Sequence, residues 1–128
     1  MATKIFGGAA GGQPWLIEVN KTADYTVLNT DNGTLFTAGG GATRTFTLPS
    51  LVNGVGCTFW FFNPQNNNMV ITAPSGKLQI DGNAAATSAT YSTGSHLIGA
   101  FCMVSMNAAG TFYYFSHIAG PGNVVSIS

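Results

Sequence analysis

Short runs of strand-forming residues, separated by turn signals about every 8 to 12 residues, constrain the fold of this chain more than any other feature. The runs are rich in Thr, Val, Ile, Phe and Tyr, and the tripeptides Asp31-Asn32-Gly33 and Asp81-Gly82-Asn83 are typical of the tight turns between them. No long window has the apolar stripe of an amphipathic helix. The sequence therefore predicts an all-β fold, a β-sandwich or jelly-roll-like domain of about ten short antiparallel strands.

The predicted strands share this composition, and glycines and other turn residues lie between many of them. The strands are Trp15–Val19, Asp24–Leu28, Thr34–Thr37, Arg44–Leu48, Cys57–Phe62, Met69–Ala73, Lys77–Ile80, Ala89–Ser92, Ser95–Met106 and Gly110–His117. We expect residues 14–128 to form one all-β domain, and residues 1–13, rich in Gly and Ala, to form a flexible N-terminal arm. That arm is either a plain terminus or a segment that orders on a partner.

Charge is scarce in this chain, and its scarcity excludes several partners. Only 6% of the 128 residues are charged, against roughly 25% in a typical domain. The four cations, spread along the chain, predict no nucleic-acid partner, because they cannot neutralise a run of phosphates. No apolar run is long enough to cross a membrane, and residues 1–13 lack the apolar core of a secretory signal. We therefore expect no membrane partner and synthesis in a cytoplasm.

The strand Cys57–Phe62 has two apolar faces. Read in alternation, Cys57, Phe59 and Phe61 point one way, while Trp60 and Phe62 point the other. Each layer of a sandwich buries one face, so the surplus face needs a cover: a loop, the N-terminal arm or a second subunit. A symmetric homo-oligomer provides that cover with one repeated patch.

The Ser95–Met106 and Gly110–His117 strands are also two-sided, and Phe101 and Met103 share one face of the first. We expect a homo-oligomer whose interface is formed by the surplus aromatic residues; these are Trp60, Phe62, Phe112 and Tyr114. The alternative is that these strands are central and covered within one chain. Cys57 and Cys102 lie in apolar runs, and we expect buried free thiols rather than a disulfide.

Candidate catalytic groups are few and scattered. The four acids lie mostly at strand ends or in turns, and His96, His117 and Cys102 lack the spacing of a zinc site. The glycine-rich tracts have no following Lys-Ser/Thr and no helix for phosphate binding. We expect no enzyme activity, no metal and no cofactor. A carbohydrate surface stays open as an alternative, formed by abundant Asn together with Trp15, Trp60, Tyr113 and Tyr114.

A series of strand and turn motifs resembles a small β-domain that recurs in tailed-phage virion proteins. The motifs run in chain order from residue 22 to residue 120: Ala23-Asp24-Tyr25-Thr26-Val27, Asp31-Asn32-Gly33-Thr34-Leu35-Phe36, Thr45-Phe46-Thr47-Leu48-Pro49, Gly54-Val55-Gly56 before Phe59-Trp60-Phe61-Phe62-Asn63, Val70-Ile71-Thr72-Ala73-Pro74-Ser75-Gly76, and the hairpin Ser95–His117. Proteins similar to this serve as capsid decoration (cement) proteins, commonly trimers, and as modules of head or tail fibres.

The resemblance implies a virion structural protein located on the capsid surface and made in the host bacterial cytoplasm. Because the chain begins with Met and has one predicted domain, we expect a separate decoration protein that binds the major capsid protein as a homotrimer. The alternative is a head-fibre, tail-fibre or spike module that binds host-surface glycans. The expected capsid contacts lie in the arm and in polar loops, including Asn63–Asn68 and Pro121–Ser128; the residues are Lys4, Ile5, Phe6, Asn66 and Asn67.

Overall fold

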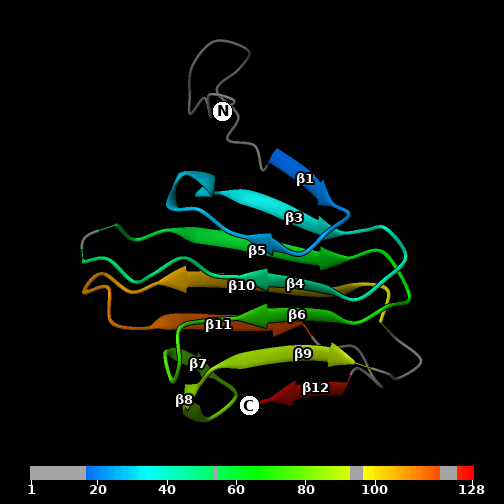
Figure 1. The fold of residues 1–128 in the computed structure, drawn as a ribbon. Helices are drawn as coiled ribbons and strands as arrows, with labels where there is room; N and C mark the ends of the chain where they lie inside the picture. Colours follow the sequence, from blue (N-terminus) through cyan, green and yellow to red (C-terminus); the bar gives the residue numbers. More distant parts are fainter. Residues whose placement is uncertain (1–16, 54, 93–96, 119–123) are drawn as a thin grey trace.

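The computed structural model describes residues 17–53, 55–92, 97–118 and 124–128 as two packed β-sheets (Figure 1). The only helical element in these ranges is the single 3₁₀ turn η2 (Asn29–Asp31). The prediction of an all-β sandwich is confirmed. Residues 1–16, which include the predicted arm and the start of the predicted strand Trp15–Val19, lie outside the described residues.

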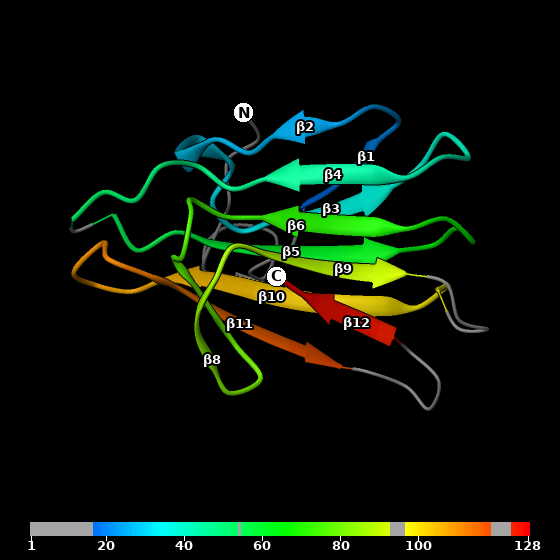
Figure 2. The ribbon, with the colours of Figure 1, turned by 60° about the horizontal axis from the view of Figure 1, so that its bottom comes forward.

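Seven strands form the larger sheet. In spatial order they are β1 (Ile17–Lys21), β3 (Thr34–Ala38), β5 (Thr58–Asn63), β10 (Ala100–Met106), β11 (Tyr113–Ile118), β7 (Leu78–Ile80) and β8 (Asn83–Ala86). Five strands form the smaller sheet, in the order β12 (Val124–Ile127), β9 (Ser88–Ser92), β6 (Met69–Thr72), β4 (Arg44–Thr47) and β2 (Tyr25–Thr26). The turned view shows the smaller sheet lying over the larger one (Figure 2).

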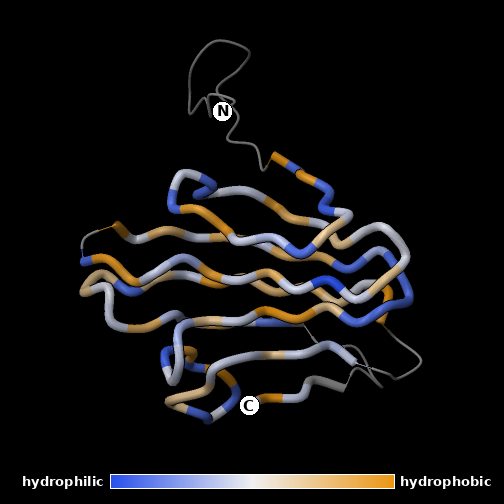
Figure 3. The backbone as a smooth tube through the Cα atoms, viewed as in Figure 1, coloured by the Kyte–Doolittle hydropathy of each residue, from blue (hydrophilic) through white to orange (hydrophobic). Residues whose placement is uncertain are grey.

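The core lies between the two sheets and is built from the inward-facing residues of each strand. An aromatic group crosses the layers: Phe46 of the smaller sheet lies 5.8 Å from Phe36 and 5.1 Å from Phe61 of the larger sheet, measured between ring centroids. Phe36 and Phe61 stack on neighbouring strands at 5.6 Å. Hydrophilic residues gather mainly in the turns at the strand ends (Figure 3). The alternation read from the sequence thus places Cys57, Phe59 and Phe61 in the core, as expected.

The expectation of purely antiparallel strands is wrong, because five of the ten strand pairs are parallel. From β1 to β6 the chain alternates between the sheets, so β1, β3 and β5 fall in one and β2, β4 and β6 in the other. The chain therefore passes through the opposite sheet before it returns, and each strand runs parallel to the previous strand of its own sheet. The winding has no fixed sequence period: Ile17 aligns with Thr34, but Leu35 aligns with Trp60.

Two strands escaped prediction, and several were predicted too long. The strand β8 is mostly Asn and Ala, which have low strand propensity, and it forms because the turn before it folds the chain back onto β7. The C-terminal strand β12 (Val124–Ile127) lies within the polar loop expected at Pro121–Ser128. The predicted strand Asp24–Leu28 is reduced to Tyr25–Thr26, and the predicted strand Ser95–Met106 begins only at Ala100, after Gly99 at φ 95°.

Glycine and aspartate hold positive φ angles where the backbone must turn sharply. In the β7–β8 turn, Asp81 has φ 46° and Gly82 has φ 81°, the two consecutive positive values of a tight hairpin turn. Gly110 has φ 67° and packs so closely against the 52–53 backbone that an added Cβ would clash with Val52 and Asn53. The turn predicted at Asp81-Gly82-Asn83 is confirmed.

Both cysteines are buried free thiols, as predicted. The Cys57 thiol lies 3.4 Å from the Asn29 carbonyl oxygen, and Cys102 is enclosed in the core. Burial raises the pKa of both thiols, since a thiolate would lose its hydration there. Neither thiol is therefore placed for nucleophilic chemistry.

Candidate functional site

The larger sheet has an apolar side that faces away from the core. Its members come from three adjacent strands, β3, β5 and β10; they are Leu35, Trp60, Phe62, Phe101 and Met103, and we call them the outer apolar face. The strand register aligns Trp60 with Leu35 on one side and Met103 on the other, and aligns Phe62 with Phe101. Met103 is 36% exposed and the other four are partly buried. A shallow groove of about 230 Å³ is lined by Trp60, Phe101 and Met103 of this face and by Ser116 and His117 of β11.

None of the five members of this face carries a formal charge, although Glu18 of β1 aligns with Leu35 at its edge. The sequences of β3, β5, β10 and β11 contain no Asp, Glu, Lys or Arg. Polar hydrogen bonds border it on two sides. At the β1 edge, Thr37 Oγ1 accepts from Asn20 Nδ2 at 2.9 Å and donates to Glu18 Oε2 at 3.0 Å. Along β5 and β10, the hydroxyls of Thr58 and Ser105 lie 2.9 Å apart. An apolar centre with a satisfied polar rim is the anatomy of a protein–protein interface.

The predicted interface residues are only partly brought together. Trp60 and Phe62 lie side by side on the outer apolar face, as alternation along β5 requires. Tyr114 follows on β11, beside Ser105 of β10, and is 51% exposed. Phe112 precedes β11 and is partly buried, with Lys77 Nζ 5.2 Å from its ring centroid.

Sequence reasoning left three members of the face out of the predicted interface: Leu35, Phe101 and Met103. The alternation of Ser95–Met106 had already placed Phe101 and Met103 on one side of their strand. The missing information was that β10 lies between β5 and β11, which brings those side chains next to Trp60 and Phe62.

The predicted capsid contacts are divided between described and undescribed residues. Lys4, Ile5 and Phe6 lie outside the described residues. Asn66 is exposed in the loop after β5, whereas Asn67 is partly buried and its carbonyl accepts a 2.8 Å hydrogen bond from Asn63 Nδ2. The expectation that Asn63 begins a polar surface loop is wrong: it is the buried last residue of β5, and its side chain ties down the loop.

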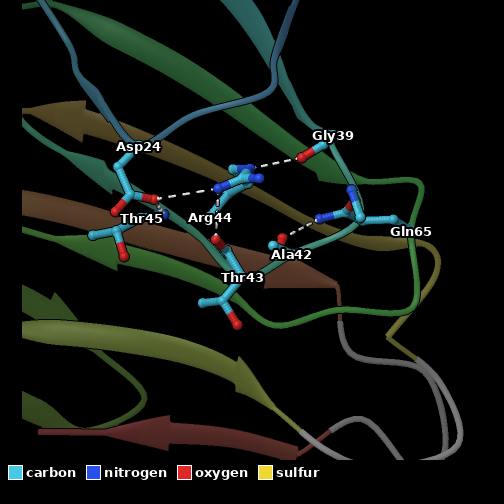
Figure 4. Close-up of polar contacts among 8 residues, drawn as sticks. Asp24, Gly39, Ala42, Thr43, Arg44, Thr45 and Gln65 are labelled. Carbon is cyan, nitrogen blue, oxygen red and sulfur yellow. Dashed lines mark hydrogen bonds and ion pairs between the residues drawn. The ribbon is translucent and has the colours of Figure 1, made fainter.

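The best-connected cation has a structural role (Figure 4). Arg44 Nε donates to the Gly39 carbonyl at 2.7 Å, and Arg44 Nη1 donates to the Thr43 carbonyl at 3.1 Å. Asp24 Oδ1 accepts from the Thr45 backbone N–H at 2.9 Å and lies 3.9 Å from Arg44 Nη1. These contacts hold the turn before β4 in place.

Asp31 likewise supports a local turn. Its Oδ2 accepts from the Tyr25 hydroxyl at 2.7 Å and from the Leu28 backbone N–H at 2.9 Å. Burial, together with the hydrogen bond to Asp31 and its negative charge, raises the pKa of Tyr25 to about 12. The phenol therefore holds its proton as the donor of this contact across the physiological range.

A second surface feature lies where the β7–β8 hairpin meets β11. Here an open depression of about 420 Å³ is lined by Gln79, Asp81, Asn83 and Tyr114, among others. Asp81 Oδ2 accepts a 2.7 Å hydrogen bond from Nε2 of His117, whose side chain is only 10% exposed. We call this the Tyr114 depression.

Neither feature has the titratable groups of a metal centre. In the described ranges, no three His, Cys, Asp or Glu side chains lie close enough together to hold a metal ion. In the same ranges, no helix has the length and hydrophobicity needed to cross a bilayer. No protein-family model matches the chain, and a search of curated proteins finds no match.

Proposed function

We propose that the chain is a virion structural protein, a homotrimeric decoration (cement) protein that binds the outer surface of a tailed-phage head and stabilises it. The observation that carries the proposal is the outer apolar face, centred on Trp60 and Met103 and free of charge. It supports self-association because an uncharged patch meets its own copy without like-charge repulsion. The choice of a phage capsid as the larger assembly comes from the resemblance to small phage virion domains.

A threefold axis suits such a patch. Three copies can each turn the outer apolar face toward the axis, and each face then meets both neighbours. The charged fraction of 6% gives a freely diffusing chain little electrostatic protection from association, so a permanent place in a larger assembly suits this composition.

Stabilisation of a shell would be thermodynamic. A protein that binds the assembled capsid but not its separated subunits stabilises the assembly by mass action. A trimer that touches several capsomers at once gains avidity from contacts that are individually weak. The exposed Asn66 loop and residues 1–13 are the proposed points of contact with the major capsid protein.

Two measurements test the proposal: the mass of the protein in solution and its binding to undecorated capsids. Light scattering should give a particle of three chains of 13.2 kDa each, and the protein should co-sediment with undecorated capsids. The same experiment on a chain lacking residues 1–13 measures the contribution of the arm. A monomer that does not co-sediment would contradict the proposal.

The second candidate is a head-fibre, tail-fibre or spike module that binds host-surface glycans, and the Tyr114 depression favours it. Both candidates place the protein on the outside of a virion, where it faces the host. Retention on undecorated capsids therefore separates them, since a fibre module has no reason to bind the bare shell lattice.

A further inference from the structure

We infer that the Tyr114 depression binds a neutral pyranose sugar. Its volume of about 420 Å³ falls within the range of small-molecule sites, about 300–1,000 Å³. The inference deepens the second candidate, a glycan-binding module, and does not rest on capsid decoration. The depression adjoins the outer apolar face, since His117, which holds Asp81, also lines the groove beside Trp60 and Met103.

The first requirement of a sugar site is an aromatic platform. Tyr114 is 51% exposed, although aromatic residues in strands usually pack in the core. It stands beside Gln79, its strand-register partner on β7, at the margin of the depression. The apolar C–H face of a pyranose can lie on such a ring while the hydroxyls project toward the surrounding polar groups.

The second requirement is an acceptor held in a fixed direction. Asp81 Oδ2 is held by His117 Nε2 at 2.7 Å, and the backbone of Asp81 is set by the tight turn. No other hydrogen bond of this carboxylate is found among the described residues, and its side chain is 48% exposed. A carboxylate fixed before the ligand arrives can accept hydrogen bonds from sugar hydroxyls without losing further side-chain freedom.

The histidine that holds Asp81 is itself fixed. His117 Nδ1 is buried and has no partner among the described residues, whereas Nε2 faces the carboxylate. The geometry therefore assigns the proton to Nε2, because a carboxylate oxygen can only accept. His117 is thus a positioning residue, and Asp81, Gln79 and Asn83 would contact the sugar.

Asn83 and Gln79 complete the polar side. The Asn83 side-chain oxygen accepts from the Ala85 backbone N–H at 2.9 Å, which leaves its amide N–H groups available as donors. One aromatic face, one carboxylate and two amides match the amphipathic surface of an uncharged sugar. The Asp81 carboxylate disfavours uronic and sialic acids, because their carboxylates would lie beside it.

The test uses the full chain and four probes: methyl β-glucopyranoside, methyl β-galactopyranoside, methyl α-mannopyranoside and, as the charged analogue, methyl β-glucuronide. Amide chemical shifts are followed at up to tens of millimolar sugar. We expect at least one neutral glycoside to shift the amides of Gln79, Asn83 and Tyr114 saturably, and the glucuronide to bind at least tenfold more weakly.

Variants separate stacking from charge. Tyr114→Ala should weaken binding at least tenfold, whereas Tyr114→Phe, which keeps the ring, should stay within about threefold of the parent. In the Asp81→Asn variant, the new residue tolerates the same positive φ. This variant should bind neutral glycosides more weakly, and the ratio of their affinity to that of the glucuronide should fall. Leu28→Ala removes an exposed apolar side chain outside the depression and should leave the affinity for each glycoside unchanged.

Four results would overturn the inference: no shifts with any sugar, shifts that map away from the depression, equal binding by the Tyr114→Ala variant, or dissociation of the oligomer by Tyr114→Ala. Light scattering of the same samples reports the proposed function separately. If Tyr114→Ala dissociates the oligomer, Tyr114 is an interface residue and the sugar site is wrong. If the protein is monomeric but binds sugar, only the decoration proposal fails.

Discussion

Met103→Glu provides the sharpest test of the outer apolar face. Met103 is 36% exposed and lies between Trp60 and Ser116 in the strand register, so a carboxylate there can reach water in the isolated domain. The free energy of unfolding of one domain should therefore change little, by roughly 0.5 to 1 kcal/mol. In an oligomer that buries this face, the same carboxylate would lie in the interface without a partner.

The cost of an unpaired buried charge is about 3–5 kcal/mol. Since each 1.4 kcal/mol corresponds to a factor of ten, the dissociation constant should rise at least about 100-fold. Around a threefold axis the loss would be greater, because three carboxylates of like sign would approach one another. Light scattering and sedimentation velocity over a dilution series measure the change, and urea unfolding measures the domain.

The matched control is Leu28→Glu, which makes the same chemical change at an exposed apolar residue away from the face. It should leave the oligomer intact. If Met103→Glu associates as tightly as the parent, the face is not the interface and the reasoning from its lack of charge is refuted. A milder change, Trp60→Ala, should weaken association more than it lowers the melting temperature of the domain.

Three further predictions concern the domain itself. Gly110→Ala should cost a few kcal/mol in urea unfolding, because it adds a backbone clash to its positive φ, whereas Gly56→Ala, with open space, should cost about 1–2 kcal/mol; equal losses would contradict the packing described. Cys57 and Cys102 should react with a disulfide reagent far more slowly in the native protein than in denaturant, and rapid native labelling would contradict their burial. The pKa of Tyr25 is raised to about 12, so above pH 10 the unfolded chain releases a proton that the folded state keeps, and stability should fall as the pH rises from about 10 to 12; a flat urea midpoint over that window would count against the contact with Asp31.

The local chemistry of the chain was readable from the sequence. Alternation assigned Phe59 and Phe61 to the core and Trp60 and Phe62 to the opposite face, because side chains of a pleated strand alternate regardless of which strand lies next to it. The tight turn at Asp81 was readable for the same reason, since Asp-Gly favours positive φ angles through its own covalent geometry.

The order of the strands was decided only by the tertiary structure. The chain alternates between two sheets, which makes β1, β3 and β5 parallel neighbours. No sequence period predicts this alternation, because the number of residues between successive strands of one sheet varies. The same placement of β10 beside β5 joins Phe101 and Met103 to Trp60 in one face.

Asp81 and His117 show most directly what the sequence alone could not predict. Each was recognised in the sequence, one as a turn residue and one as a strand-end histidine, yet they are 36 residues apart and meet only because β7 pairs with β11. Propensity and alternation act over a few residues, whereas a site requires side chains from distant segments to converge. The sequence by itself therefore determined which side chains of a predicted strand share a face, and the packing of the sheets decided which exposed groups became neighbours.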